Sequence, residues 1–234
     1  MQNGIIHQKF WSRSAEGLPI ALYRKDNNSP SRFRDKKPLL FLGGMHGDEP
    51  EGVRLAQDLL QWLILEASTE SSRDYWPWIL IPCLNVEGFQ NKQRTNSRGV
   101  DLNRNFPTAD WRQSPQRDRY YTGPAPASEP EVKSLVSLIS AEQPRVIFHF
   151  HSWNPCLIYT GDPGKNFAET LTVGNNYPVK AEIGYPTPGS LGEWGWHSMK
   201  TPVICIEEQE HSDLDQVWPH FSAGLKKILQ GEVS

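Results

Sequence analysis

The stretch Leu39-Leu40-Phe41-Leu42, which ends in Gly43-Gly44, decides the fold class. A compact apolar run bounded by glycines is typical of a buried β-strand. The residues that follow, 53–63, place apolar side chains at helical spacing, and Pro50 and Glu51 suit the first turn of that helix. The sequence therefore predicts a buried strand that leads directly into a helix.

The same alternation continues along the chain. Strands are predicted at 78–83, 146–151 and 202–207, and helices run from a Ser128 N-cap to about Ile139 and from Trp218 to Leu229. Between them, residues 85–118 are predicted to form a long, partly irregular loop. We expect one α/β domain over residues 1–234, with a mixed, largely parallel sheet sandwiched by helices. In such sheets, ligands bind beyond the carboxyl ends of the strands.

Composition narrows the class of protein. The chain has 234 residues, 37% of them hydrophobic, which is enough for one sizeable core. The net charge of −3 gives no reason to expect nucleic-acid or membrane-surface binding. We see no signal peptide and no run long enough to span a bilayer. Its three cysteines match no zinc or redox motif, so we expect reduced core cysteines in a cytoplasmic protein, outside the metal ligand set.

The first chemical motif is His46-Gly47-Asp48-Glu49, immediately after the first strand. An imidazole nitrogen and a carboxylate oxygen from such a turn suit Zn²⁺ at about 2.0–2.2 Å. The spacing alone is common, and it also fits a surface turn with a capping acid. Its position at a strand's carboxyl end, beside glycines, favours a metal site.

A catalytic zinc site needs a third protein ligand, and His151 is the candidate because it ends an apolar strand. His149 lies two residues earlier and faces the same side of that strand. Because it is deeper in the apolar run, we interpret His149 as a core or supporting histidine.

Two further groups of polar residues accompany the metal motif. Asn103 and Arg104 offer amide donors and a planar guanidinium fork that can bind a carboxylate, although either could also be solvated in an exposed loop. Glu207 ends the last predicted strand, where burial would raise its pKa as a general base requires. Glu208 and Glu210 are its competitors. Alternation puts Glu207 and Glu208 on opposite faces but does not say which face holds the metal.

Taken together, these motifs resemble the M14 zinc carboxypeptidase family, from Leu39 to just beyond Glu207. The sequence is most similar to the bacterial murein peptide amidase branch, whose members cut the γ-D-glutamyl–meso-diaminopimelate bond. That similarity rests on the stretches 94–107 and 184–190 and on the short length.

The resemblance implies a role for each site residue. One Zn²⁺ would be held by His46, Glu49 and His151, and Asp101 would orient His46. Glu207, rather than Glu208, would be the general base and then the general acid, and Arg94 would stabilise the oxyanion. The residues that bind the substrate, a small peptide with a free carboxylate, would be Asn103, Arg104 and Tyr185. The family also implies a cis peptide at Ser152–Trp153.

Two departures from the nearest amidases stand out. His151 is followed by Ser152-Trp153 rather than aspartate, and Glu208 stands where an apolar residue is common. An N-acyl amino acid hydrolase of the desuccinylase and aspartoacylase type shares the zinc motif, but usually carries a C-terminal β domain, whereas a short helical tail follows Glu207 here. A plain carboxypeptidase and a non-catalytic zinc-dependent peptide-binding protein also remain open. The sequence leaves the oligomeric state undetermined.

Overall fold

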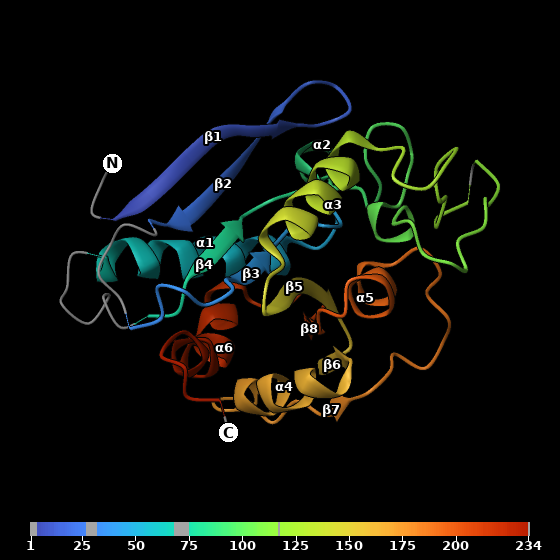
Figure 1. Cartoon of the computed structure of the whole chain (residues 1–234). Coiled ribbons are helices and arrows are strands. Elements are labelled where there is room, and N and C mark those ends of the chain that lie inside the picture. The colour runs from blue at the N-terminus through green and yellow to red at the C-terminus, as the bar shows by residue number, and fades with distance from the viewer. Residues whose placement is uncertain (1–3, 27–31, 68–74, 117, 234) are drawn as a thin grey trace.

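A computed structural model describes residues 4–26, 32–67, 75–116 and 118–233. One eight-stranded sheet runs through the molecule (Figure 1), in the order β1-β2-β4-β3-β5-β8-β6-β7. The strands are β1 (Ile5–Arg13), β2 (Pro19–Lys25), β3 (Leu39–Leu42), β4 (Trp78–Ile81), β5 (Val146–Trp153), β6 (Cys156–Thr160), β7 (Val179–Lys180) and β8 (Val203–Gln209).

The centre of the sheet is parallel and its edges are mixed. β4, β3, β5 and β8 run in the same direction, whereas β1, β2 and β6 join through antiparallel pairs. The carboxyl ends of the four central strands therefore meet at one edge. Strands that are buried on both faces tolerate continuous apolar runs, and β3 and β4 are buried throughout.

Helices cover both faces of this sheet (Figure 1). One face packs against α1 (Pro50–Glu66), α4 (Lys165–Leu171) and α6 (Leu214–Leu229), through Phe41, Phe148 and Ile206. The other face carries Leu40, Ile147 and Val203, which share a core with residues of α3 (Pro130–Glu142) and α5 (Leu191–Glu193). The short α2 (Val86–Asn91) lies beside this second layer. The α/β fold with a mixed, largely parallel sheet, expected from the sequence, is confirmed.

The long connection predicted after residue 85 is only partly irregular. It contains α2 and a 3₁₀ turn, Leu102–Arg104, whose N-cap Asp101 accepts a hydrogen bond from the backbone N–H of Asn103. The four strands and three helices expected from the sequence are all present, with ends that differ by up to four residues. β1, β2, β6, β7, α2, α4 and α5 were not predicted.

Three local predictions were wrong. Ser128 does not cap α3, because the N-cap is Glu129 and the Ser128 hydroxyl instead bonds to the Glu129 carboxylate at 2.9 Å. The last helix begins at Leu214, where Asp213 caps it, rather than at Trp218. The described residues contain no cis peptide, and Ser152 and Trp153 continue the β5 pairing opposite Glu208 and Gln209.

The three cysteines, Cys83, Cys156 and Cys205, are free thiols, as predicted. Among the described residues, no helix has the length and apolar character needed to cross a membrane.

Candidate metal centre and substrate pocket

The turn that carries His46 and Glu49 joins β3 to α1 at the carboxyl edge of the sheet. Two glycines allow its close packing. A Cβ on Gly47 would lie 1.9 Å from the Gly88 backbone of α2, and one on Gly52 would lie 2.3 Å from the Phe150 carbonyl of β5. Contacts below 3.0 Å require something to shift, so glycine is needed at both positions. The backbone approach at Gly52 brings the start of α1 against the strand that ends in His151.

Three potential metal ligands converge from this turn and from β5. Glu49 Oε1 lies 2.7 Å from His46 Nδ1, and Glu49 Oε2 lies 2.7 Å from His151 Nδ1. The ligand atoms of the three residues lie within 4.8 Å of one another, and all three side chains are buried. Two imidazole nitrogens and one carboxylate oxygen are the donor set of many catalytic zinc sites, so these residues fit Zn²⁺.

The carboxylate of Asp101 contacts the ring nitrogen of His46 that faces away from Glu49. Asp101 Oδ1 lies 3.2 Å from His46 Nε2, and Asp101 Oδ2 accepts a hydrogen bond from Arg94 Nε at 2.9 Å. Burial alone would raise the pKa of Asp101, but His46 and Arg94 outweigh it and hold that pKa below its usual range. Burial alone would lower the pKa of His46, but Glu49 and Asp101 raise it to about 9. Such a partner fixes the ring so that Nδ1 faces Glu49.

His149 lies deeper in the site. Its Nδ1 is 2.9 Å from His151 Nε2, and burial lowers the pKa of His149 well below its ordinary value. His149 therefore contacts the candidate ligand His151 directly, as a supporting histidine would.

Glu207 faces the same space from β8, and Glu208 faces away from it. Glu207 is buried, its Oε1 accepts a hydrogen bond from the Cys205 thiol at 3.0 Å, and burial raises its pKa. β8 pairs with β5 so that Glu207 lies opposite His151. Glu210 is exposed at the pocket mouth. The structure thus puts Glu207, rather than its competitors, beside the candidate metal ligands.

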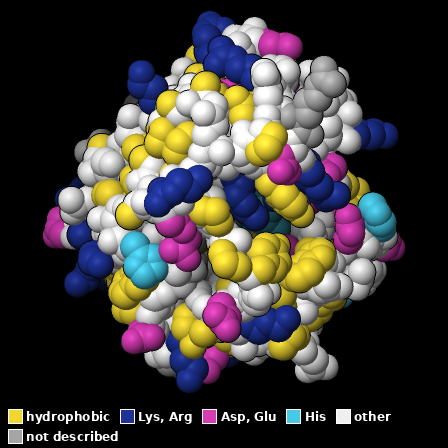
Figure 2. Space-filling view, turned by 90° about the vertical axis from the view of Figure 1, so that its right-hand side faces the viewer, with side chains coloured by type: hydrophobic (Ala, Val, Ile, Leu, Met, Phe, Trp, Pro, Cys, Tyr) yellow, Lys and Arg dark blue, Asp and Glu magenta, His cyan; other side chains and the backbone are white. Residues whose placement is uncertain are grey.

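A pocket opens outward from these residues, and Figure 2 shows it as a hollow on the face that is turned to the viewer. Arg94, Arg104 and Tyr185 line it, as does Asn103. Tyr185 is 48% exposed and packs edge-on against Trp153, with 6.3 Å between the ring centres. All of the substrate-binding residues suggested by the sequence therefore lie in one pocket.

Two guanidinium groups of this pocket, those of Arg94 and Arg104, share an aromatic neighbour that the sequence analysis missed. The Tyr120 ring lies 5.2 Å from the Arg94 guanidinium carbon and 5.4 Å from that of Arg104. Arg104 also donates to the Asn103 carbonyl at 2.8 Å, and Asn103 Oδ1 accepts from the Leu191 backbone N–H at 2.9 Å. These contacts hold two cations side by side, as recognition of a carboxylate and of a developing oxyanion would require.

A buried histidine and glutamate centre, a buried second glutamate and paired arginines define a metallohydrolase of the carboxypeptidase class. Comparison with known proteins agrees: residues 3–220 match the zinc carboxypeptidase (M14 peptidase) family, and the chain belongs to that family and is a hydrolase.

Three similar proteins illustrate the relationship. Murein peptide amidase A of Escherichia coli K12 is 33% identical over 196 residues, which cover 79% of this chain and 74% of that protein. The crystal structure of murein-tripeptide amidase MpaA from E. coli O157 has a TM-score of 0.74 and 28% identity, and covers 97% of this chain and 92% of that one. Carboxypeptidase A from Helicoverpa armigera shares the fold, with a TM-score of 0.76 at 16% identity over 99% of this chain and 68% of that one.

Proposed function

We propose that this hydrolase uses one Zn²⁺ per chain, held by His46, Glu49 and His151, to cleave an amide bond next to a free carboxylate. The observation that carries the proposal is the convergence of these ligands with Glu207 on one side of the paired β5 and β8. Zn²⁺ held by these three residues would supply a Lewis acid that lowers the pKa of water towards about 7 and polarises a carbonyl. A glutamate with a raised pKa beside a metal site is suited to accept and return protons near neutral pH.

The chain's own residues supply the remaining steps. Glu207 takes a proton from the attacking water and passes it to the leaving amine. The Arg94 guanidinium, whose side chain is 14% exposed, is aimed at the site by its hydrogen bond to Asp101 and donates to the developing oxyanion. Asp101 keeps His46 in its binding orientation.

Substrate selection falls to the outer pocket. Asn103 and Arg104 bind the carboxylate adjacent to the cleaved bond, because a guanidinium fork and an amide match its two oxygens. Tyr185, exposed at the rim, contacts the bound substrate.

We further propose that the substrate is a murein peptide, cut at the γ-D-glutamyl–meso-diaminopimelate bond. Two relatives bear the names murein peptide amidase and murein-tripeptide amidase. The pocket itself supports a ligand of mixed charge, since its lining carries Arg104 and Arg119 together with Glu182 and Glu193. Diaminopimelate presents ammonium and carboxylate groups at once. We place the activity in the cytoplasm, which three free thiols favour.

The test is product identification. Zinc-loaded protein is incubated separately with a murein tripeptide, simple peptides and N-acyl amino acids, and the products are identified by mass. We expect free diaminopimelate from the first substrate, at a kcat/KM well above that for the others. Release of C-terminal amino acids from ordinary peptides alone would indicate a plain carboxypeptidase, and deacylation alone an N-acyl amino acid hydrolase. Binding without turnover would contradict an enzymatic role.

A further inference from the structure

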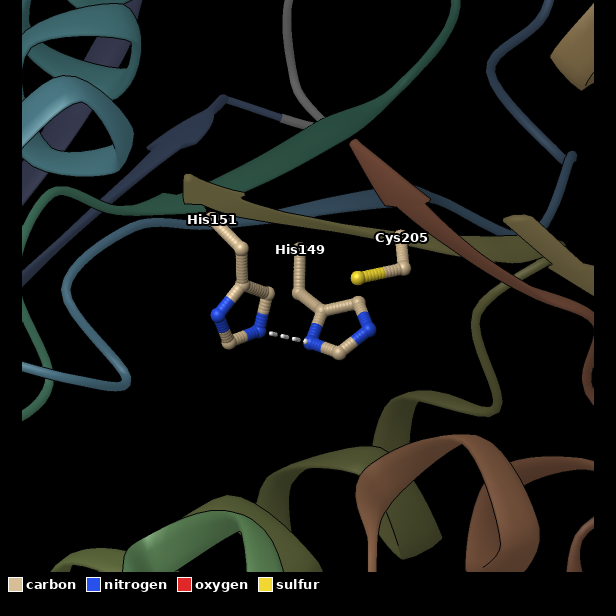
Figure 3. A group of neighbouring side chains, drawn as sticks. All are labelled: His149, His151 and Cys205. Atoms are coloured by element: carbon tan, nitrogen blue, oxygen red, sulfur yellow. Dashed lines mark hydrogen bonds between the residues drawn. The ribbon is translucent and has the colours of Figure 1, made fainter. Parts of the chain in front are cut away.

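A second group of metal-binding side chains lies at the floor of the pocket, behind the proposed zinc ligands. Figure 3 shows His149 and His151 of β5 and Cys205 of β8 on the same side of two adjacent strands. His149 and Cys205 are directly paired across these strands, and one ligand atom from each of the three residues lies within 4.8 Å of the others.

The distances suit a metal with modest adjustment. The two imidazoles face each other through His149 Nδ1 and His151 Nε2, 2.9 Å apart. Zn²⁺ bonds of about 2.0–2.3 Å in a tetrahedron put ligand atoms about 3.3–3.6 Å apart, so the rings would separate by a few tenths of an ångström for zinc and by more for a larger ion such as Cd²⁺. A neutral imidazole keeps one nitrogen lone pair for a metal. A soft sulfur donor distinguishes this group from the His46, Glu49 and His151 group.

We propose that His149, His151 and Cys205 form an alternative metal position that takes thiophilic divalent ions such as Cd²⁺ and excludes the proposed catalytic zinc. The exclusion follows from His151, because its Nδ1 faces Glu49 and its Nε2 faces His149. A neutral imidazole has one lone pair, so it binds a metal on one side at a time. We call the site formed by His149, His151 and Cys205 the inner position. That it can bind a metal is independent of the proposed function, but that its metal excludes the catalytic zinc rests on the proposed function.

Occupation of this position also disturbs Glu207. The Cys205 thiol donates to Glu207 Oε1 at 3.0 Å, and this thiol must lose its proton when a metal–sulfur bond forms. One proton is therefore released for each ion bound through Cys205. The ion then stands beside the Glu207 carboxylate, which is held as a metal neighbour instead of a general base. A thiophilic ion inactivates the enzyme both by taking His151 and by engaging the base.

The first experiment uses metal-free protein and Cd²⁺ alone. Wild type should bind cadmium with an ultraviolet sulfur-to-cadmium charge-transfer band that saturates at one ion per chain, with proton release. The variant Cys205→Ser should lack the band. His149→Gln should keep the thiol but bind cadmium at least about tenfold more weakly, since even outer partners of a metal are worth 10–100-fold. The matched control is Cys83→Ser, because Cys83 is a thiol outside this group. A band in Cys205→Ser, or none in wild type, overturns the proposal.

The second experiment starts from zinc-loaded protein. Added Cd²⁺ should release zinc mole for mole as the sulfur band grows. Activity should be lost in wild type and in Cys83→Ser. Cys205→Ser should retain most of its own starting activity at the same cadmium concentration. Zinc that stays bound while the sulfur band saturates would overturn the exclusion. Failure of the proposed function looks different: all three proteins would then lack zinc-dependent activity from the start, while the sulfur band would still report on the inner position.

Discussion

Glu207 and Glu208 are neighbours on β8, are both buried, and face opposite sides of the sheet. Glu208 is fully engaged: Tyr177 donates to one oxygen, as does the Gln209 backbone N–H at 2.7 Å, and the other oxygen lies 2.7 Å from His220 Nδ1. Glu207 receives one hydrogen bond, from the weak thiol donor Cys205. A buried carboxylate with strong donors is part of the structure, whereas one with few donors holds its proton more readily and is available for chemistry.

The same contrast between the two sides of the sheet is found at β5. His151 faces the pocket, and the next residue, Ser152, faces α1, where its hydroxyl donates to buried Glu51 at 2.7 Å. Glu49, two residues before Glu51, turns to the pocket instead, between His46 and His151. In both places, therefore, the carboxylates on the side of the sheet covered by α1, α4 and α6 hold neighbouring groups in position, and we propose that those on the pocket side serve metal and proton chemistry. Each prediction below tests one side of this contrast.

The largest effect, on zinc binding, is expected when Glu49 and Glu51, the two carboxylates at the start of α1, are replaced one at a time. Glu49→Ala should reduce zinc affinity by more than the roughly 10–100-fold that outer partners cost, because it removes a ligand. Zinc content after dialysis and hydrolysis rate should fall together. Glu51→Gln, the matched control, keeps an acceptor for Ser152 and should retain zinc. Equal zinc loss in both variants would contradict the ligand assignment.

The next effect is expected at β8. Glu207→Gln removes the proposed base while preserving shape, and kcat/KM should fall by about 10²–10⁴-fold with zinc content unchanged. Glu208→Gln, one residue away, should change kcat/KM by less than about tenfold, since its side chain lies on the other face. Comparable activity losses in the two variants would mean that the contrast between the faces is wrong.

A third prediction concerns stability on the side of the sheet covered by α1, α4 and α6. Glu208→Ala leaves Tyr177, His220 and the Gln209 N–H without their shared acceptor, and should lower the free energy of unfolding by about 3 kcal/mol. Urea denaturation measures this loss. Glu207→Ala serves as the control and should cost less, because it breaks one weak hydrogen bond. The opposite order would show that partner count does not determine the role of these acids.

The strands differ in how well the sequence predicts them. β3 was predicted to the residue because an apolar run ended by glycines has few other interpretations. β1 was missed because most of its side chains are exposed and its pairing partner is β2 alone, so its conformation depends on a neighbour rather than on periodicity. Ile20 and Leu22 of β2 do alternate inward, and that signal could have been found.

The site divides in the same way. His46, Glu49, His151 and Glu207 stand at strand ends, so strand prediction alone brings them to one edge. Tyr120 could not be predicted, because its loop has no periodicity. The loop is held by Ser114 and Thr122, each of which donates its backbone N–H to the other's hydroxyl oxygen at 3.0 Å. Glu208 stands where an apolar residue is common in the family. The sequence could not explain this difference, because the partners of Glu208, Tyr177 and His220, come from distant segments of the chain.

The smallest effect should come from a third kind of buried acid, Glu131 in the first turn of α3. One of its oxygens accepts from the Ala15 N–H at 3.0 Å, and the other has no hydrogen-bond partner within the described residues. Burial raises its pKa to about 7, yet it lies outside the pocket lining. If few partners were sufficient for function, Glu131 would matter to catalysis. We expect it to affect stability alone, because no metal ligand or substrate group adjoins it.

The sign of that stability effect follows from linkage. The unfolded chain titrates near the ordinary value of 4.5 and the folded chain near 7, so between these values the folded state binds more protons. The free energy of unfolding contributed by Glu131 therefore falls as pH rises from about 4.5 to 7 and then levels off, by on the order of 2 kcal/mol. Glu131→Gln removes this dependence: relative to wild type, it should gain stability between pH 5 and pH 8 in urea denaturation, with kcat/KM unchanged at both. A wild-type-minus-variant difference that does not vary with pH would show that Glu131 is ionised throughout, and a loss of activity would mean that partner count, wherever it occurs, marks a functional acid.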